Sequence, residues 1–594
     1  MAAKRALLPS APSPSAASST PPPKRRRTTT TTTTTTTPPG HPPPSAPASR
    51  DRLTRLSDEL LLRVLSFLPL PHLLFSAAPV SRRLHALAAD AQLWRALYYA
   101  RFVLPRALRI PGLARATAAD AQLRLHRAGR RALWADGRRG AVLAWREDDG
   151  AGRGGGGGGG VDWKRQYRIR HNWARGACAV EELRMGQEGV ARGDAGAGGP
   201  KMLVKIVEGV AITADRWAGL RVWDLKSKRM LVRALLGDAA PSCIAVDDSA
   251  LGRGIVAVAV GFKDGSFGIW RLHTEAKQLD KRYGHERCNN GALVAMALSY
   301  PYLLTATESV LVSLYTFAHQ GDPGTPGDSL DPTTAAPWPP PHQLTSLGSH
   351  TSKPPLALAI RRLPTATVAS IAYTFTTWQG WCIGIQNLHV AGAAPTTTRL
   401  AYTPPGPPGR AAGPTALSYT HPYLLATLPD NTLLLHLCTA GAAGALSVAP
   451  GLRLWGHTSG IGDADITARG RAVSVSARGG EVRVWDLEGG GGRGSVEVRP
   501  GEGGAVAAGE GWDERRDWVG FDDEMVLVLK EGAEGRESLV VYDFTPGGGM
   551  NATAAVLLGK PQRQGARPLR HGRDDHAEIL RGAARATGSC EGSA

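Results

Sequence analysis

The segment GLRVWDL at residues 219–225 returns far along the chain as GEVRVWDL at residues 480–487. A third version, KDGSFGIW at residues 263–270, keeps the turn, the apolar alternation and the tryptophan. Alternating apolar residues that follow a Gly or Asp turn are typical of a β-strand leaving a hairpin. Because such units recur at a spacing of roughly 40–50 residues, the sequence predicts a repeated β-sheet architecture.

Weaker units with the same β-rich texture fill the interval between these copies. The segments LSYPYLLT (298–305) and LSYTHPYLLAT (417–427) are near copies of each other, so we expect them to form equivalent strands. One residue toward the end of the third strand can be chosen in each unit. These residues are Trp223, Trp270, Tyr315, Ile385, Leu435, Trp485 and Tyr542. The chain between residues 174 and 546 is therefore predicted to hold seven units, with six or eight as alternatives.

These units resemble WD repeats, in which four antiparallel strands form each blade of a β-propeller. The resemblance implies a hydrogen-bonded network in each blade between a Gly-His histidine, a turn aspartate and the third-strand tryptophan. Here only fragments of that network are expected: His457 and Trp485 are present, but Gly479 stands where the turn aspartate belongs. The tryptophans are interpreted as blade packing and not as catalytic groups.

A short helical region precedes the repeats. Ser57 can cap a helix whose first turn holds Asp58 and Glu59, where the helix dipole favours negative charge. Apolar residues then recur at helical spacing until Pro69 and Pro71, and further helical stretches follow up to about residue 100. The first helix carries more leucines than so small a bundle can cover, which indicates a partner.

The segments LSDELL (56–61), VLSFLP (64–69), LL (73–74), VSR (80–82) and LWR (93–95) resemble the F-box family in their order. The chain departs from the family pattern at Ser57, His72 and Leu84 without removing the apolar face. The resemblance covers residues 51–100 and implies docking on a Skp-family adaptor, and through it on a cullin–RING ubiquitin ligase. The residues expected to bind the adaptor are Leu56, Leu60, Leu61, Val64, Leu65, Leu68, Leu73 and Leu74.

Length and composition set the limits of this organisation. The 594 residues include 72 Gly and 43 Pro and carry a net charge of +19. We divide them into a disordered basic tail rich in Pro, Ser and Thr (1–50), the F-box (51–100), a basic linker with a polyglycine insert (101–173), the propeller (174–546) and a disordered tail (547–594). Residues 318–354 and 392–414, rich in Pro, Thr and Gly, are interpreted as disordered insertions between blades.

The positive charge is concentrated before the propeller. Residues 1–50 hold seven basic and no acidic residues, and residues 51–150 hold 17 basic and nine acidic residues. The cluster Lys24, Arg25, Arg26 and Arg27 resembles a nuclear import signal, with a solvated charge run as the alternative. The basic and aromatic segment 163–173 is interpreted as a linker that packs the helices against the propeller; stacking on nucleic acid is the less favoured alternative.

No catalytic or cofactor chemistry is predicted. The six cysteines are scattered, without the spacing of a zinc ribbon or a RING, and no nucleophile or metal motif is present. No run of about 18 apolar residues predicts a transmembrane helix, and the first residues lack a secretory signal. We expect an intracellular protein, nuclear or cytoplasmic, that needs no metal or other cofactor.

The turns between second and third strands are the predicted substrate site. Arg216, Trp217, Lys263 and Arg478 stand in these turns and would suit an acidic or phosphorylated segment, with solvated loop charges as the alternative. The predicted function is that of a non-catalytic substrate-recognition subunit of an SCF-type cullin–RING ubiquitin ligase. The alternative is a propeller scaffold in a nuclear or RNA-associated complex.

Overall fold

A computed structural model of the chain describes residues 53, 55–103, 161–185, 201–287, 289–318, 338–348, 352–363, 366–391, 394–405, 412–440, 445–487, 494–500, 514–532 and 537–546. The chain divides into two compact units, residues 1–57 and 58–594, and all helices and strands below belong to the second. The predicted tails, the import-signal cluster Lys24–Arg27 and the polyglycine insert lie outside the described residues.

The N-terminal helices form the predicted small bundle. Helix α1 begins at Asp58 and ends before the two prolines, which cannot continue it. Ser81 caps α2 by accepting a hydrogen bond from the Leu84 amide, and Asp90 caps α3 in the same way. The elements are α1 (Asp58–Leu65), the π-helix η1 (His72–Ala77), α2 (Arg82–Ala88), α3 (Ala91–Tyr98) and the π-helix η2 (Tyr99–Val103).

Helix α7 (Trp163–Arg175) connects this bundle to the sheets. Asp162 accepts a hydrogen bond from the Arg165 amide at its start. Gly176 ends it in the left-handed conformation at φ 68°, where an added Cβ would lie 2.2 Å from the Glu497 carbonyl oxygen. Both the conformation and the close approach therefore require glycine at this position.

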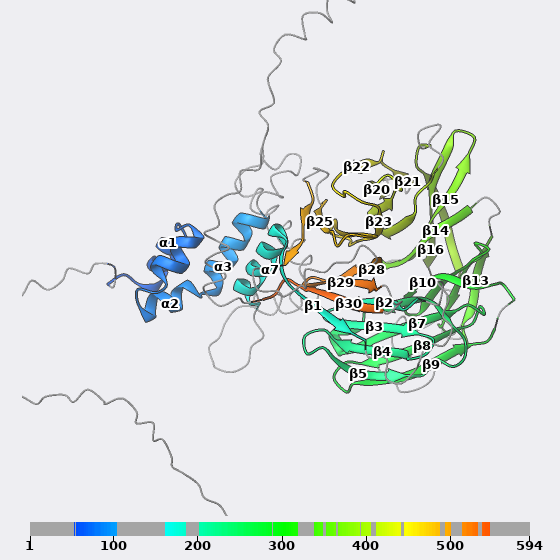
Figure 1. Ribbon diagram of the computed structural model, residues 1–594, viewed down its shortest axis with the longest axis horizontal. Helices are drawn as coiled ribbons and strands as arrows, with labels where there is room; N and C mark the ends of the chain where they lie inside the picture. The colour runs from blue at the N-terminus through cyan, green and yellow to red at the C-terminus, as the bar shows by residue number, and fades with distance from the viewer. Residues whose placement is uncertain are drawn as a thin grey trace, which may run out of the picture. The chain divides into compact units, whose positions relative to one another are not determined.

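The described strands form seven sheets, each with four main strands that are antiparallel, arranged as the blades of a propeller (Figure 1). Blade 1 contains β2 (Leu203–Val207), β3 (Val210–Asp215), β4 (Gly219–Asp224) and β5 (Arg229–Ala234). Blade 2 contains β6 (Pro241–Asp247), β7 (Ile255–Phe262), β8 (Phe267–His273) and β9 (Gln278–His285), with the 3-10 turn η4 (Leu251–Arg253). Blade 3 contains β10 (Leu293–Ser299), β11 (Tyr302–Thr307), β12 (Val312–Thr316) and β13 (His342–Leu347).

The remaining four blades repeat this order. Blade 4 contains β14 (Ser352–Arg362), β15 (Thr367–Thr377), β16 (Gly380–Ala391) and β17 (Ala394–Tyr402). Blade 5 contains β18 (Ala416–Thr420), β19 (Tyr423–Thr427), β20 (Leu433–Ala440), β21 (Leu446–Val448) and β22 (Leu452–Leu454). Blade 6 contains β23 (Ile461–Ile466), β24 (Arg471–Ser476), β25 (Val482–Asp486) and β26 (Val496–Glu497). Blade 7 contains β28 (Arg515–Phe521), β29 (Met525–Glu531), β30 (Glu537–Asp543) and β1 (Ala177–Arg184), and the short β27 (Arg499–Pro500) pairs with β1.

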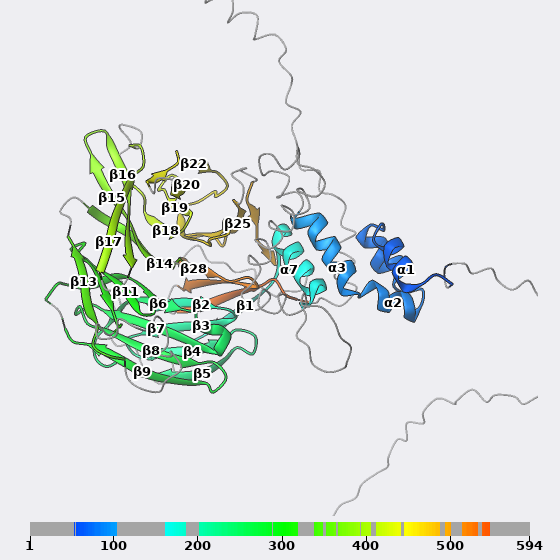
Figure 2. The ribbon, with the colours of Figure 1, turned by 180° about the vertical axis from the view of Figure 1, so that it is seen from behind.

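Blade 7 closes the ring with strands from both ends of the propeller. Its outer strand β1 precedes all the other strands in sequence, yet it pairs antiparallel with β30, from Ala179 opposite Asp543 to Arg184 opposite Ser538. This pairing ties the first strand to the last sheet without a covalent link. Figure 2 shows from behind the cyan β1 with the orange strands of blade 7, a sheet in which β30 and β29 lie between β1 and β28. A closed ring leaves no blade with an open face toward a missing neighbour.

The seven predicted units are confirmed. All seven residues chosen from the sequence lie in third strands of blades, namely β4, β8, β12, β16, β20, β25 and β30. Two segments interpreted as insertions contain strands instead: residues 342–347 form β13 and residues 394–402 form β17. These are outer strands with few large apolar residues, so the apolar pattern that marks inner strands is weak in them.

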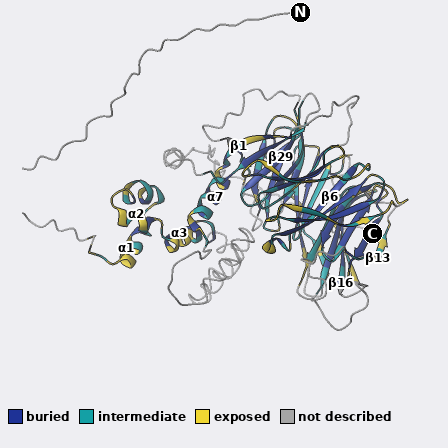
Figure 3. Ribbon diagram, turned by 90° about the horizontal axis from the view of Figure 1, so that it is seen from below, coloured by how far each residue is buried: buried dark blue, intermediate teal, exposed yellow. Residues whose placement is uncertain are grey.

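The hydrophobic core lies between neighbouring blades. Every residue of β7 (IVAVAVGF) is buried, because both faces of a blade are covered in a propeller. Figure 3 shows the strands mainly in the colour of buried residues, whereas α1 and α2 show much exposed surface. No helix in the described part of the chain is long and apolar enough to cross a membrane.

The blades give the propeller two distinct ends. Because successive strands of a blade are antiparallel, every turn between second and third strands lies at the same end of the ring, together with the connections between blades. We call this end the bc face. The opposite end carries the turns between first and second strands, including the β28–β29 turn that receives helix α7.

Candidate functional site

Helix α1 and the turn that follows it present a stripe of exposed apolar side chains. Leu60, Val64 and Phe67 follow one another at i, i+4 and i+7, and their exposed fractions are 54%, 45% and 72%. The guanidinium of Arg63 lies 5.1 Å from the centre of the Phe67 ring, which keeps one cation beside the stripe. A small bundle that leaves three large apolar side chains in solvent has the surface expected of a docking site.

The residues predicted to bind an adaptor divide between surface and core. Leu60 and Val64 are exposed, whereas Leu61, Leu65 and Leu73 are buried in the bundle and cannot contact another protein. The other three predicted residues, Leu56, Leu68 and Leu74, are half-buried. Three exposed large apolar residues of this region were not in the predicted set, Leu53, Phe67 and Val80, although the helical spacing from Leu60 marks Phe67.

Helix α7 contacts the bundle with one part of its surface and the propeller with another. Tyr167 meets Trp94 edge-on, with ring centroids 5.4 Å apart, and its hydroxyl accepts a hydrogen bond from Arg101 at 2.7 Å. Trp173 stacks on Phe544 at 4.0 Å between centroids and donates its indole N–H to the Asp523 carbonyl oxygen at 2.9 Å. The aromatic residues of segment 163–173 are buried in these contacts, so they offer no stacking surface for nucleic acid.

The four residues predicted to bind a substrate all lie on the bc face and are exposed. Arg216 and Trp217 form the β3–β4 turn, Lys263 lies in the β7–β8 turn and Arg478 in the β24–β25 turn. The Arg216 guanidinium lies 5.3 Å from the centre of the Trp217 ring. Topology thus brings these side chains to one end of the ring, on blades 1, 2 and 6, without bringing them into one cluster.

The β3–β4 turn is held in shape by an aspartate. The Asp215 carboxylate accepts hydrogen bonds from the backbone amides of Trp217 and Ala218 and forms an ion pair with Arg221 at 2.7 Å. A side chain that accepts bonds from the backbone two residues on is typical of a tight turn. Trp217 is therefore displayed on an ordered turn, with 57% of its surface exposed.

Further aromatic and aliphatic residues on the bc face were not predicted. Trp378 occupies the two-residue β15–β16 turn with 91% of its surface exposed. Trp455 follows β22, whose Leu454 pairs with the first residue of β20, and Leu235 follows β5; both are exposed. The sequence signal available was a tryptophan within a turn, as in TTWQGW (376–381), which a search for basic turns does not detect.

Blade 6 contains a complete buried polar network. Ser474 Oγ accepts a hydrogen bond from Trp485 Nε1 at 2.8 Å and lies 2.6 Å from His457 Nε2. His457 Nδ1 lies 3.3 Å from Glu481 Oε2, and burial lowers the pKa of His457, so the ring is neutral at pH 7. The expectation of a broken network was wrong: Glu481, two residues after Gly479, supplies the carboxylate.

Two inner-strand aspartates link blade 6 to its neighbours. Asp463 accepts a hydrogen bond from the Val519 amide of blade 7, and Asp465 accepts one from the Ser418 hydroxyl of blade 5. Burial, and to a lesser extent the nearby Asp465, raises the pKa of Asp463 to about 7. Because these carboxylates accept hydrogen bonds from neighbouring blades, we interpret their role as structural.

No metal-binding cluster of His, Cys, Asp and Glu is found among the residues that the structure describes. Cys178, Cys243, Cys382 and Cys438 are free and buried. Burial raises the pKa of the Cys178, Cys243 and Cys438 thiols to about 12, so these thiols are poor nucleophiles at neutral pH. The described geometry therefore offers surfaces for other macromolecules and no assembled nucleophile.

The helical bundle matches a known protein family. Residues 55–100 match the F-box-like family model. Among solved structures, a computationally designed protein, Ika8, matches with 15% identity and a TM-score of 0.34, over 57% of this chain and 82% of its own. The β-propeller domain of Myceliophteria thermophila Cps50 (Swd1) matches with 10% identity and a TM-score of 0.39, over 61% of this chain and 99% of its own.

A search of curated protein sequences finds no match. The family model described as the F-box protein pof12 beta-propeller matches residues 194–504 and 495–545, which together take in all seven blades apart from strand β1. This match covers more than half of the chain and lies C-terminal to the F-box-like match. The chain is therefore an F-box protein with a seven-bladed propeller and belongs to the pof12 beta-propeller family.

Proposed function

We propose that this protein is the substrate-recognition subunit of an SCF-type cullin–RING ubiquitin ligase. The observation that carries the proposal is the exposed stripe of Leu60, Val64 and Phe67 on the F-box-like bundle. Its solvent-exposed apolar area would be covered by a Skp-family adaptor. Burying about 100 Å² of apolar surface contributes roughly 2.5 kcal/mol, so three such side chains can anchor an interface.

The propeller would supply the substrate-binding part. Its bc face carries exposed tryptophans beside basic turns, a composition that suits protein recognition because aromatic and Arg residues are enriched at interface hot spots. The basic turns support an acidic or phosphorylated substrate segment, since Arg pairs with carboxylate and phosphate oxygens. The substrate is proposed to be a protein and not a nucleic acid.

The proposed mechanism is non-catalytic. Helix α7 contacts both the bundle and the β28–β29 turn, at the end of the ring opposite the bc face. A substrate held on the bc face would be kept near a ubiquitin-loaded partner bound through the adaptor, which raises its effective concentration. The protein would act inside the cell, and the cluster Lys24–Arg27 would direct part of it to the nucleus.

The test of adaptor binding is affinity purification of the full chain followed by mass spectrometry. Replacing the exposed Leu60 and Val64 by Asp places charges in the stripe without entering the core. The matched control is Met230→Asp, another exposed apolar residue, on the outer strand of blade 1. Loss of adaptor and cullin from the double variant alone supports the proposal, and equal recovery from all three proteins contradicts it.

Substrate capture is tested with variants of the bc face. Charge reversal of Arg216 and Arg478 to Glu is expected to remove captured substrate proteins while adaptor recovery stays at the wild-type level. If the captured proteins are unchanged, the basic turns do not bind substrate. If intact protein never retains an adaptor, the scaffold function becomes the better account.

A further inference from the structure

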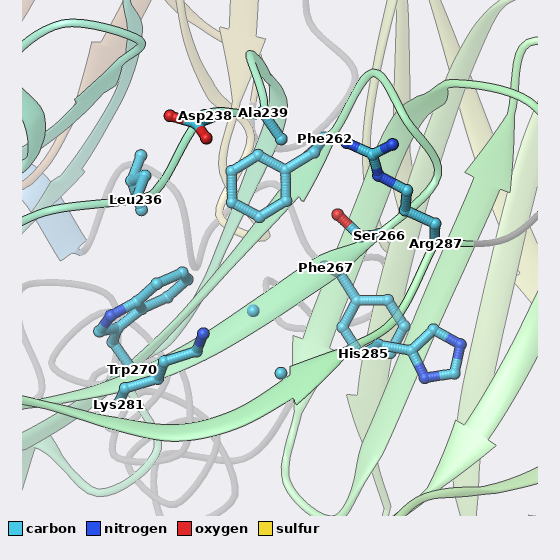
Figure 4. A pocket seen from close by; sticks show the side chains of 12 residues that line it. Leu236, Asp238, Ala239, Phe262, Ser266, Phe267, Trp270, Lys281, His285 and Arg287 are labelled. Atoms are coloured by element: carbon cyan, nitrogen blue, oxygen red, sulfur yellow. The ribbon is translucent and has the colours of Figure 1, made fainter.

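A recess of about 270 Å³ opens between the β5–β6 connection and the outer strands of blade 2 (Figure 4). Its lining comes from three places that meet on the bc face. Leu236, Asp238 and Ala239 lie on the β5–β6 connection, Ser266 lies on the β7–β8 turn, and the remaining residues lie on β7, β8 and β9 or just after β9. The recess therefore lies on the bc face, between the connection from blade 1 and the strands of blade 2.

A cross-strand pair of glycines shapes the recess. Gly268 of β8 and Gly284 of β9 lie directly opposite each other. The Trp270 ring covers Gly268, because an added Cβ there would lie 2.4 Å from the ring. At Gly284 an added Cβ would meet nothing but the flexible end of Lys281, at 3.2 Å. The space beside Gly284 exists because this residue has no side chain.

Of the two basic side chains that line the recess, one forms an ion pair with a carboxylate of the described chain and the other does not. Arg287 forms an ion pair with Asp264, Nε to Oδ2 at 3.0 Å, and the Ser266 hydroxyl also donates to Asp264. Lys281 has no carboxylate partner among the described residues, and its ammonium lies 5.8 Å from the centre of the Trp270 ring. Asp238, which is exposed, is the one acidic side chain in the lining.

The aromatic floor holds the polar groups in place. His285 stacks on Phe267 with centroids 4.5 Å apart, and its Nδ1 lies 3.1 Å from the Tyr283 hydroxyl. Burial lowers the pKa of His285, so it faces the recess as a neutral group at pH 7. Among the charged side chains of the lining, the cations Lys281 and Arg287 exceed the anion Asp238 by one positive charge, which attracts an anion.

We propose that this recess is an anchor subsite that takes one anionic side chain, a carboxylate or a phosphate, of a peptide bound across the bc face. The proposal rests on the proposed function and assigns a specific place to the acidic part of the substrate. The volume is below the range of roughly 300–1,000 Å³ usual for small-molecule sites, and it suits one side chain. Lys281 supplies the point charge, and the space beside Gly284 admits the side chain.

The test measures binding of labelled peptides to the full chain by fluorescence anisotropy. The probe has three consecutive glutamates flanked by Gly and Ala. A second probe replaces the middle glutamate by phosphoserine, and a third has glutamines throughout. Binding of the first two and not of the third is expected, and the tighter of the two identifies carboxylate or phosphate as the preferred group. Equal binding of the glutamine peptide, or no binding of either acidic peptide, overturns the proposal.

Three variants locate the binding. Lys281→Gln is expected to weaken it roughly three- to tenfold, and Asp238→Asn on the opposite wall to strengthen it by a similar factor, because they remove charges of opposite sign. Gly284→Leu fills the recess and is expected to weaken binding at least tenfold. Its control is Gly252→Leu in the η4 turn at the other end of blade 2, where an added Cβ meets nothing within 4 Å.

The outcomes separate this proposal from the proposed function. Unchanged binding in Lys281→Gln overturns the anchor subsite, and this result can be read even if Gly284→Leu misfolds. In that case, if adaptor recovery and Arg216-dependent substrate capture are still observed, the receptor function stands. If replacing Leu60 and Val64 does not change adaptor recovery, the receptor function is wrong. The recess is then tested separately, by peptide binding to the Lys281 and Gly284 variants.

Discussion

Replacing Ser474 by Ala tests the buried network of blade 6. The Ser474 side chain is fully buried and joins Trp485 Nε1 at 2.8 Å to His457 Nε2 at 2.6 Å. Alanine fits the space but leaves both buried partners without their hydrogen bond. Each buried polar group left unsatisfied costs about 1–3 kcal/mol. We therefore expect the free energy of unfolding to fall by roughly 2–5 kcal/mol, a large effect for the loss of one oxygen atom.

The assay is urea denaturation of the full chain, followed by tryptophan fluorescence. The matched control is Ser447→Ala, whose exposed hydroxyl bonds Thr439 Oγ1 at 2.8 Å; water replaces that bond, so we expect a change below about 0.5 kcal/mol. A Ser474→Ala variant as stable as the Ser447→Ala control would refute the reasoning, because the network would then contribute nothing to blade packing.

Three further changes have predicted signs. His171 of α7 is buried, neither of its ring nitrogens has a hydrogen-bond partner in the described chain, and burial lowers its pKa to about 4. His171→Phe should therefore raise the unfolding temperature. It should also reduce the loss of stability that the wild type shows as the pH falls from 6.5 toward 4. The pKa of Asp463 is raised to about 7, so this residue stabilises the fold most at low pH, and its contribution is lost as the pH rises from 4 through 7. In urea titrations at several pH values, Asp463→Asn should remove this decline in the free energy of unfolding. Gly462→Ala would place a Cβ 2.2 Å from the Arg516 carbonyl oxygen and should cost about 1–3 kcal/mol in thermal unfolding, whereas Gly460→Ala, with no atom nearer than 3.9 Å, should not.

The features predicted from the sequence are those that repeat locally. The third strands were found because each ends an alternating apolar run, and all seven, from Trp223 to Tyr542, lie where expected. The bundle helices were found because leucine spacing and capping residues act within a few positions of one another. Both kinds of signal depend on near neighbours in sequence, which a single chain displays.

The features that escaped prediction depend on distant partners or on helical phase. Strand β1 pairs with β30 across more than 350 residues, and nothing in its own sequence marks that partner. The packing role of segment 163–173 was predicted, but its helical form was not, because a helix that buries residues against two different surfaces lacks a simple apolar pattern. The carboxylate of the blade 6 network was expected at position 479, but Glu481, two residues later, supplies it to His457. The longer Glu side chain and the path of the turn make up for the shift.

The candidate sites were predicted in part for the same reason. The resemblance to the F-box family selected Leu60, Leu61, Val64 and Leu65 together, but a helix rotates about 100° per residue, so adjacent side chains point in different directions. The structure leaves Leu60 exposed and buries Leu61. On the propeller, strand order alone placed the basic turns on one face, whereas the recess beside Gly284 depends on cross-strand register that the sequence does not display.

Adaptor binding by the α1 stripe is the central claim, and one measurement tests it most directly. Purified Skp-family adaptor is titrated against the full chain and against the Leu60→Asp, Val64→Asp double variant, with Met230→Asp as the control, by isothermal calorimetry. The account predicts tight binding of wild type and control, and at least a hundredfold loss in the double variant with an unchanged unfolding temperature. Equal affinity for all three proteins, or no binding by any of them, would contradict it.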